Sequence, residues 1–563
     1  MSDRWWENSV IYEIFPRSFK DSNGDGIGDI QGIISKLDYI RDLGVDAIWL
    51  CPIYKSPNDD SGYDISDYYS IWNELGTMED FHRLVAELKK RDIKLIMDLV
   101  VNHSSDEHEW FIESKKSKDN PYRDYYIWKR GKNGKKPNNW LATKVGGSAW
   151  EYDEGTDEYY LHIYSKKQPD FNWENPRVRQ SIYDIMKFWI DKGVDGFRMD
   201  VINKIAKEDG LPDVKRKVGD TREYLPAEEY FQNHPKVHKY LKEMNKEVLS
   251  KYEGIMALGQ TQGLTPEDAY LYTGEERNEI NMFLQFEHVE LDKKGNRKLA
   301  FDLVEFKRII NKWQIALDGK LWNTIFFGSH DLSRSVSHFG NDKKYRIQSA
   351  KMLATILLTL KGTPIVYFGD EIGMTNVRFS DIDDYRDIRT SNIYKERVLE
   401  GKEDIKRVME DIWEISRDNA RTPMQWDLSK NSGFTNGEPW IKVNENYKEI
   451  NVYNNLIDEN SIYNYYKKMI KLRKNNDVLR KGKFKLLLEK DEYVFSYIRE
   501  WNNKKVLIIA SFSNEEIKVN LDLEALNDFN NCQLLISNYE NKYEDISDIN
   551  LRPYEVRVYS LNN

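Results

Sequence analysis

The sequence predicts an α/β fold, a TIM barrel of parallel strands, and two repeating features predict it. Eight short apolar runs, each the length of a buried strand, recur along most of the chain. Between them lie amphipathic stretches such as Ile30–Leu43 and Met78–Lys90, with apolar residues three and four positions apart. Eight alternating βα units are typical of a (β/α)8 barrel. The runs are Val10–Phe15, Ala47–Leu50, Lys94–Val101, Gly196–Asp200, Ile255–Gln260, Glu279–Phe283, Thr324–Ser329 and Pro364–Phe368.

The uneven spacing of these runs divides the chain into domains. The third and fourth runs are separated by far more residues than the dozen or so that a crossover needs. We interpret the excess, residues 104–173, as a lobe inserted over the barrel mouth, rich in Tyr, Trp, Asn and Lys. The barrel is then expected over 1–103 and 174–480, with a polar subdomain at about 376–460.

After about residue 480 the pattern changes to short alternating strands. The clearest hairpin joins Val494–Arg499 to Val506–Phe512 through a turn at Trp501–Lys504. We therefore predict a C-terminal antiparallel β-sandwich domain over residues 481–563.

Length and composition exclude several classes of protein. A chain of 563 residues with a formal net charge of −10 is too long for one simple domain, and its charge disfavours nucleic acid and anionic membranes. It contains no apolar stretch of membrane-spanning length and no apolar segment of a signal peptide near its start. Cys51 and Cys532 lie far apart, which fits a reducing compartment. We expect a cytoplasmic monomer without an organic cofactor.

Polar side chains gather where five of the predicted strands end. The active site of a TIM barrel lies at the carboxyl ends of its strands. One such strand alone would be an ordinary transition from strand to loop, but five together indicate a site. The residues at these ends are Asn102-His103, Arg198 with Asp200, Gln260, His330-Asp331 and Asp370-Glu371.

Arg198 and Asp200 indicate the chemistry of that site. They lie two apart on a predicted strand, so their side chains share a face. A guanidinium beside a carboxylate keeps it ionised, which suits a nucleophile that attacks an anomeric carbon. The alternative is a buried structural ion pair. His103 and His330 follow other strands and are expected at the same mouth rather than in purely structural positions.

These residues carry a resemblance to the α-amylase superfamily, glycoside hydrolase family 13, and within it to oligo-1,6-glucosidases. The chain resembles them over essentially its whole length, in the blocks NDDSGYDISDY at Asn58–Tyr68, DLVVNH at Asp98–His103, GFRMDVIN at Gly196–Asn203 and RDNARTPMQW at Arg417–Trp426.

The resemblance implies a role for each site residue. Asp200 would be the nucleophile of a retaining mechanism, position 260 the acid/base, and Asp331 the carboxylate that binds sugar hydroxyls. Arg198 would orient Asp200. His103 and His330 would hold hydroxyls of the same glucose, and Tyr63 would stack beneath its ring. Asp60 and Arg417 would hold the non-reducing side and close the pocket, so that cleavage is exo, and Gln168 would flank it. Glu371 would lie nearer the leaving sugar.

Val201, directly after Asp200, bears on linkage preference. In this family a valine here accompanies preference for α-1,6 bonds, and its branched side chain can shape the leaving-sugar pocket. The alternative is an ordinary strand residue. The substrate expected is a small α-glucoside such as isomaltose.

The loop after the first strand is a candidate metal site. It presents hard oxygen donors at alternate positions, as in the first part of an EF-hand, but Gly32 stands where an EF-hand has its last glutamate. Related glucosidases bind Ca²⁺ or Mg²⁺ at the matching loop. The ligands would be Asp21, Asn23, Asp25, the Ile27 carbonyl and Asp29, in a structural role; the alternative is a metal-free turn.

Gln260 is the largest departure from the family, which has glutamate there. An amide has no titratable proton to give the leaving oxygen, and acid–base catalysis contributes about 10²–10⁴-fold. Because the rest of the site is intact, our hypothesis is that Gln260 was engineered to hold uncleaved substrate. Smaller departures at Val145, Tyr164, Ser329 and Ser333 suggest an altered pocket beyond the first glucose.

Two alternatives remain open. A transglycosylase or sucrose isomerase would share the Asp200 chemistry, although Val201 disfavours it. A catalytically dead carbohydrate-binding or scaffold protein would fit Gln260, but not the retention of Asp200, Asp331 and Arg198.

Overall fold

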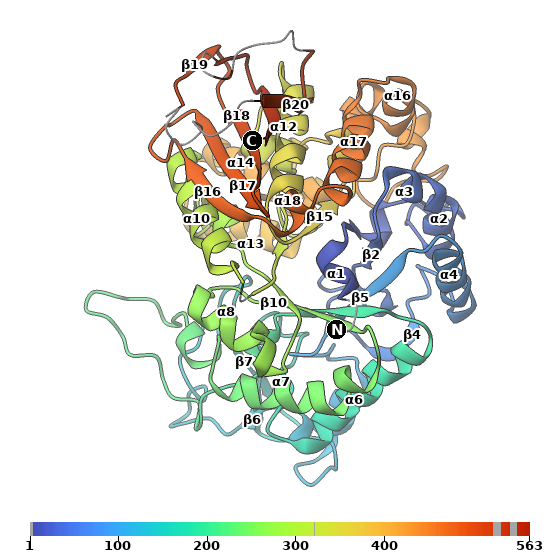
Figure 1. Cartoon of the computed structure of the whole chain (residues 1–563). Helices are drawn as coiled ribbons and strands as arrows, with labels where there is room; N and C mark the ends of the chain where they lie inside the picture. The colour runs from blue at the N-terminus through green and yellow to red at the C-terminus, as the bar shows by residue number, and fades with distance from the viewer. Residues whose placement is uncertain (1–3, 320, 522–530, 541–545, 547–548, 563) are drawn as a thin grey trace.

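A barrel of eight parallel strands forms the centre of the molecule (Figure 1). The computed structural model describes residues 4–319, 321–521, 531–540, 546 and 549–562. The strands follow the order β11-β10-β9-β5-β2-β1-β15-β14, and the hydroxyl of Thr324 donates to the carbonyl of Phe283 across the remaining gap. The barrel is therefore nearly closed. Its strands are β1 (Ile11–Ile14), β2 (Ala47–Leu50), β5 (Lys94–Val100), β9 (Gly196–Asp200), β10 (Met256–Gln260), β11 (Met282–Leu284), β14 (Thr324–Ile325) and β15 (Thr363–Tyr367).

These strands confirm the predicted barrel, with shifts at some ends. β11 begins three residues later than predicted, because the carboxylate of Glu279 is held outside the sheet by Arg277 and His238. β14 keeps only the first two residues of its predicted run. Every residue of these strands except Lys94 is buried, as expected of parallel strands covered on both faces.

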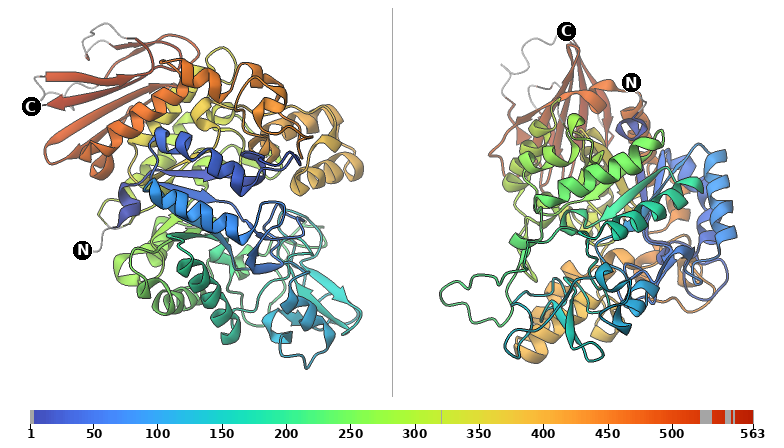
Figure 2. Two further views of the ribbon diagram at one scale, coloured as in Figure 1. Left: turned by 90° about the vertical axis from the view of Figure 1, so that its right-hand side faces the viewer. Right: turned by 90° about the horizontal axis from the view of Figure 1, so that it is seen from below.

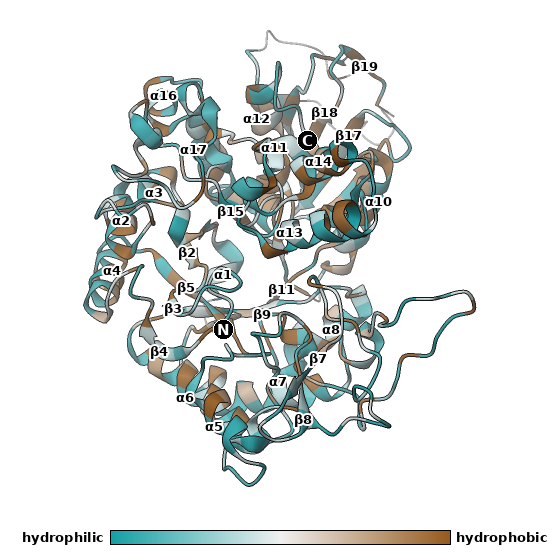
Figure 3. Cartoon of the chain, turned by 180° about the vertical axis from the view of Figure 1, so that it is seen from behind, coloured by the Kyte–Doolittle hydropathy of each residue, from teal (hydrophilic) through white to brown (hydrophobic). Residues whose placement is uncertain are grey.

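Helices cover the outside of the barrel, and most of them bury one apolar face. In Figure 3 the outer helices α4 and α10 show alternating hydrophilic and hydrophobic colours along their length. A capping box between Thr77 and Asp80 starts α4. The single helix predicted at Ile30–Leu43 is instead two, separated at Lys36, whose backbone leaves the helical region. The principal helices are α2 (Ile30–Ser35), α3 (Leu37–Leu43), α4 (Met78–Lys90), α6 (Pro176–Asp191), α7 (Lys236–Glu247), α8 (Pro266–Thr273), α10 (Leu303–Ala316), α12 (Arg346–Thr359) and α17 (Ile462–Lys474).

A lobe between β5 and α6 stands at the carboxyl ends of the strands. It contains α5 (Glu109–Lys116) and a small antiparallel sheet of β6 (Trp128–Lys129), β8 (Glu158–Leu161) and β7 (Trp150–Asp153). A second stretch, 207–235, packs onto it: Trp140 pairs with Leu225 and its indole donates to the carbonyl of Pro212. The lobe is therefore built from two separate parts of the chain, of which the sequence predicted only 104–173.

The C-terminal strands form a separate layer at the end of the molecule away from this lobe (Figure 2). The hairpin of β17 (Val494–Trp501) and β18 (Lys504–Ser511) turns through Asn502 and Asn503, which both adopt positive φ as a type I′ turn requires. With β16 (Lys483–Leu487), β22 (Val556–Asn562) and β20 (Asn531–Ser537) it makes a five-stranded antiparallel sheet, faced by the pair β19 (Ile517–Val519) and β21 (Ile549–Leu551). Of the predicted domain, residues 522–530, 541–545, 547–548 and 563 lie outside the described residues.

The polar stretch after β15 folds into short helices beside the barrel mouth. It includes α13 (Ile388–Tyr394), α14 (Ile405–Ile415), α15 (Asp418–Arg421) and α16 (Val452–Ile457), and it has a small core of its own around Val408 and Ile412. Among the described helices, none is long and apolar enough to span a membrane.

Candidate active site

Asp200, Arg198 and Asp98 form one buried charged group at the carboxyl ends of β5 and β9. Asp98 lies opposite Arg198 in the parallel register, and one guanidinium nitrogen of Arg198 donates to both Asp98 and Asp200, at 2.8 Å each. The side chain of Asp200 keeps 12% of its surface exposed, whereas Asp98 is fully buried. Arg198 therefore fixes Asp200 in one orientation and leaves it accessible to a ligand.

Tyr63 and His330 extend this group to Glu13. The hydroxyl of Tyr63 donates to Asp98 at 2.9 Å and lies 2.8 Å from Nε2 of His330, while Nδ1 of His330 lies 2.6 Å from Glu13. Burial lowers the pKa of His330 to about 3 and raises the pKa of Glu13. The imidazole is therefore neutral at physiological pH, and both of its nitrogens are hydrogen-bonded within this group.

Asp331 and Asp60 are held by shared arginines on the other side of the site. Arg417 donates to Asp331 at 3.1 Å, to Asp60 at 3.0 Å and to Asp387 at 2.8 Å, and Arg421 donates to Asp331 at 3.2 Å. Burial raises the pKa of Asp331, but Lys144, His330 and the two arginines outweigh it and hold that pKa well below its usual value. Asp331 therefore stays ionised and can accept from sugar hydroxyls.

His103 and Gln168 meet at the backbone of Tyr63. Nε2 of His103 lies 3.1 Å from the Tyr63 carbonyl and 3.2 Å from the amide nitrogen of Gln168. Tyr164 packs edge-on against the His103 ring, and its hydroxyl accepts from Lys204 at 3.1 Å. The structure thus brings both predicted residues to the pocket wall.

Gln260 and Val201 are in direct contact. The backbone N–H of Val201 donates to the side-chain oxygen of Gln260 at 3.2 Å. Val201 has φ 37° and ψ 39°, a left-handed conformation that is rare and costly for a β-branched residue. Such strain is typical of functional sites. It aims this N–H at position 260, so residue 260 lies beside the residue that follows Asp200.

Ten residues line one narrow pocket of about 20 Å³, whereas Arg198, His330 and Gln260 lie behind this lining and contact it through Asp200, Tyr63 and Val201. That is room for about one water molecule, so binding of a sugar requires the pocket to widen. Lys144, whose ammonium lies 3.9 Å from Asp331, is the flexible side chain best placed to move. The lining residues are Asp60, Tyr63, His103, Lys144, Tyr164, Gln168, Asp200, Val201, Asp331 and Arg417.

Glu371 does not reach this pocket, which corrects the expectation that it lies near the leaving sugar. Its carboxylate is fully buried and accepts from the hydroxyls of Tyr12 and Tyr39, both at 2.7 Å, and from the amide of Gly369. These three bonds give it a structural role beneath the site.

Lys144, Asp387 and Arg421 belong to the site but were not among the predicted residues. Asp387 and Lys144 lie in irregular segments where no periodic pattern marks them. Arg421 does fall within the RDNARTPMQW block, four residues after Arg417 on α15, and that spacing on a helix could have identified it.

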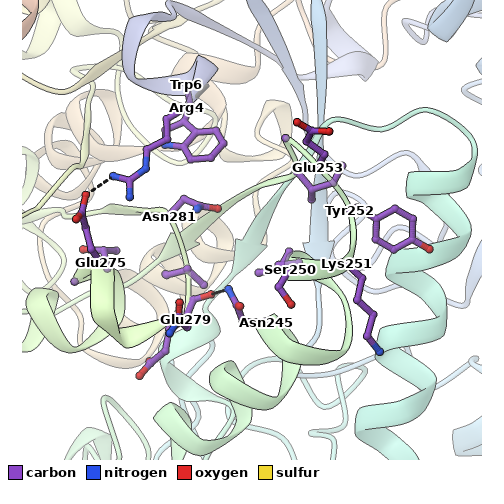
Figure 4. A pocket seen from close by; sticks show the side chains of 17 residues that line it. Arg4, Trp6, Asn245, Ser250, Lys251, Tyr252, Glu253, Glu275, Glu279 and Asn281 are labelled. Carbon is purple, nitrogen blue, oxygen red and sulfur yellow. Dashed lines mark hydrogen bonds and ion pairs between the residues drawn. The ribbon is translucent and has the colours of Figure 1, made fainter. Parts of the chain in front are cut away.

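A larger cavity of about 570 Å³ lies at the opposite end of the barrel (Figure 4). Its lining includes Ile255 and Asn281, which directly precede β10 and β11, and Arg4, which pairs with Glu275. Because active sites of this barrel form at the carboxyl ends of strands, this cavity is not the catalytic pocket.

The proposed metal loop presents the right donor chemistry. Asp21 accepts from the amides of Asn23, Gly24 and Gly26, and Asp29 caps α2 through the amide of Gly32. Burial raises the pKa of Asp21, but the hydrogen bonds from Thr435 and these amides lower it overall, so the carboxylate stays ionised. The loop is thus held in order by hydrogen bonds between its own hard oxygen acceptors and backbone amides.

Comparison with known proteins agrees with this geometry. Residues 13–482 match the alpha amylase catalytic domain, and residues 494–558 match the alpha-amylase SusG C-terminal domain. The oligo-1,6-glucosidase of Parageobacillus thermoglucosidasius is 57% identical over 99% of both chains.

Two solved structures are similar over the whole chain. A mutant trehalose-6-phosphate hydrolase from Bacillus licheniformis has a TM-score of 0.94 at 45% identity, covering 99% of this chain and 100% of its own. A glutamate-to-glutamine mutant of the isomaltulose synthase from Erwinia rhapontici, in complex with its natural substrate sucrose, has a TM-score of 0.94 at 42% identity and covers 99% of both chains. Together with the site geometry, these matches show that the chain is a glycoside hydrolase of the α-amylase family.

Proposed function

We propose that this protein is a retaining, exo-acting α-glucosidase that hydrolyses α-1,6-glucosidic bonds at the non-reducing ends of isomaltose and short isomalto-oligosaccharides. The observation that carries the proposal is that Asp200 and Asp331 line one narrow pocket, with Gln260 bonded to the backbone of Val201 on that lining. The full-length likeness to oligo-1,6-glucosidases supports the linkage and the substrate.

Catalysis would proceed in two displacements. The carboxylate of Asp200 attacks the anomeric carbon while the bond to the leaving oxygen breaks, and that oxygen needs a proton from the acid at position 260. Water then attacks the glucosyl ester and gives its proton to the same residue. Asp331 and His330 would bind hydroxyls of the glucose, and the Arg417–Asp60 pair would close the non-reducing side, so that only a chain end enters.

We propose further that Gln260 replaces the acid/base glutamate of the active enzyme. Glutamine is nearly isosteric with glutamate, and its contact with the Val201 amide is one that a carboxylate can also make. The chain as it stands should bind isomaltose and cleave it slowly.

The test is a comparison of isomaltose hydrolysis by this chain and by Gln260→Glu. A rise of about 10² or more in rate is expected for Gln260→Glu. No rise in a Gln260→Glu protein that binds isomaltose would remove position 260 from the acid/base role. Failure of both proteins to bind isomaltose would reject the α-1,6-glucosidase assignment.

A second candidate is a sucrose isomerase, favoured by the close likeness to an isomaltulose synthase. Incubation of Gln260→Glu with sucrose separates the two: release of glucose and fructose supports hydrolysis, and formation of an isomeric disaccharide supports the alternative. If Gln260→Glu binds sugars but never cleaves them, the result supports a binding or scaffold protein instead.

The loop Asp21–Asp29 is proposed to hold a structural Ca²⁺ or Mg²⁺. The protein is proposed to act as a cytoplasmic monomer. Metal analysis of the purified protein and its mass in solution test these two points.

A further inference from the structure

A second cavity, of about 330 Å³, opens beside the glucose pocket. The two share Lys144, Asp331 and Arg417 on their lining, and the second also includes Gln262, two residues after the proposed acid/base position. Because Arg417 and Asp60 close the non-reducing side, a space next to the residue 260 loop is where the leaving sugar would lie.

Besides Arg417, three cations from three separate elements line this cavity. Lys293 comes from the short strand β12 (Lys293–Lys294), Arg389 from α13, and Lys144 from the inserted lobe. In the part of the chain that the structure describes, the ammonium of Lys293 forms no ion pair or hydrogen bond. Among these described residues the guanidinium of Arg389 has a single hydrogen bond, of 3.5 Å to Asn296, and Lys144 is 3.9 Å from Asp331.

Among the described residues, Lys293 and Arg389 therefore have no carboxylate partner at ion-pair distance, and Lys144 has only a long one, Asp331 at 3.9 Å. Burial, with the charge of Arg389, lowers the pKa of Lys293 to about 8, and burial, with the charge of Lys144, lowers the pKa of Lys204 to about 8. Asp331 is already bound by Arg417 and Arg421. Glu290 is the remaining carboxylate on the lining, and within the described residues no cation lies within the 4.0 Å of an ion pair to it.

A cavity with several unpaired donors and an excess of positive charge is suited to an anion, since charge-assisted hydrogen bonds to phosphate or carboxylate are about twice as strong as neutral ones. Isomaltose is neutral and has no anionic group that could pair with these cations. We propose that this cavity binds an anionic substituent, a phosphate or a carboxylate, on the leaving sugar. The inference rests on the proposed function, because the glucose pocket must hold the other half of the substrate.

The test is calorimetric titration of the protein as it stands, whose Gln260 allows binding without rapid turnover. Matched neutral and anionic ligands would be isomaltose against its aldonic acid, which carries a carboxylate, and trehalose against trehalose phosphorylated on one glucose. We expect at least one anionic ligand to bind about tenfold tighter or more than its neutral partner. Whichever pair shows the difference identifies the anion.

Three variants locate the effect. Lys293→Met should abolish the preference for the anionic ligand, lowering its affinity about tenfold relative to that of its neutral partner. Glu290→Gln should strengthen it, because this carboxylate repels an anion. Lys294→Met is the matched control: it removes the same charge from the next residue, which is exposed and does not line the cavity, so it should change nothing.

Equal affinity for neutral and anionic ligands, or an equal effect of Lys293→Met and Lys294→Met, would overturn the proposal. If even isomaltose fails to bind, the proposed function fails, and inorganic phosphate still tests the cavity by itself. Weak phosphate binding that Lys293→Met removes and Lys294→Met keeps would support the anion site, and no binding would reject it.

Discussion

Arg417 is the single residue on which the closed side of the pocket depends, and its replacement by lysine is the sharpest test of that geometry. Its guanidinium bonds Asp331 at 3.1 Å, Asp60 at 3.0 Å and Asp387 at 2.8 Å. Lysine keeps the charge, but a single ammonium cannot copy a planar fork that bridges three carboxylates. We expect the lysine ammonium to keep the ion pair with the fully buried Asp387 and to lose the contacts with Asp60 and Asp331.

The magnitude follows from the two bonds lost. A hydrogen bond to a charged group contributes about 1.5–3 kcal/mol, so losing the bonds to Asp60 and Asp331 removes about 3 kcal/mol at the low end of that range. If this loss falls on the bound state, the dissociation constant for isomaltose rises roughly a hundredfold. Part of the loss will also appear as lower stability, because the two carboxylates then repel each other.

The assay is isomaltose titration of this chain and of Arg417→Lys, with thermal unfolding of both. Arg386→Lys is the control, since this exposed arginine lies one residue from Asp387 but does not line the pocket. An Arg417→Lys protein that binds isomaltose within threefold of the parent would refute the reasoning, because the bridge would then have no role in holding the sugar.

Three further predictions concern buried groups. Tyr63→Phe leaves His330 without its partner at Nε2 and removes a bond to Asp98; we expect a loss of about 2–4 kcal/mol in unfolding free energy, measured by denaturant titration, and a loss under 0.5 kcal/mol would contradict the network. Burial raises the pKa of Asp370 to about 7, whereas an unfolded aspartate titrates near 3.9; the native state therefore binds this proton more tightly, and stability falls as pH rises from about 4 to 7. Asp370→Asn should remove that penalty, raising the melting temperature clearly at pH 8 and little at pH 4, and an equal change at both would exclude titration of Asp370. Chelation by EDTA should lower the melting temperature of this chain but not of Asp21→Ala, and identical responses would reject a metal at the Asp21 loop.

The barrel could be predicted from the sequence because its strands are buried on both faces. A strand buried on both faces has a continuous apolar run such as Met256–Gly259, and its end then shows as the first polar residue, here Gln260. The polar residues at the strand ends could be predicted to share one site, because the carboxyl ends of all the strands lie on the same face of the barrel.

The remaining site residues could not be predicted from strand ends in the sequence. Asp387 and Lys144 occupy irregular segments, and only tertiary packing brings Asp387 to Arg417 and Lys144 to Asp331. Glu371 shows the opposite failure. It follows a strand as Asp331 does, but the hydroxyls of Tyr12 and Tyr39 hold its carboxylate away from the pocket, and the order of residues does not reveal which way such a side chain turns.

The two-part construction of the lobe has a consequence for protein engineering. Trp140 and its neighbours are covered by the stretch 207–235, which leaves the barrel after Asp200 and Val201. A chimaera that exchanged only 104–173 with a relative would strip Trp140 of its cover and present a foreign surface to the segment after the nucleophile. Substrate preference should therefore transfer between relatives only when both stretches are exchanged as a unit, and homologous recombination that separates them should yield poorly folded hybrids.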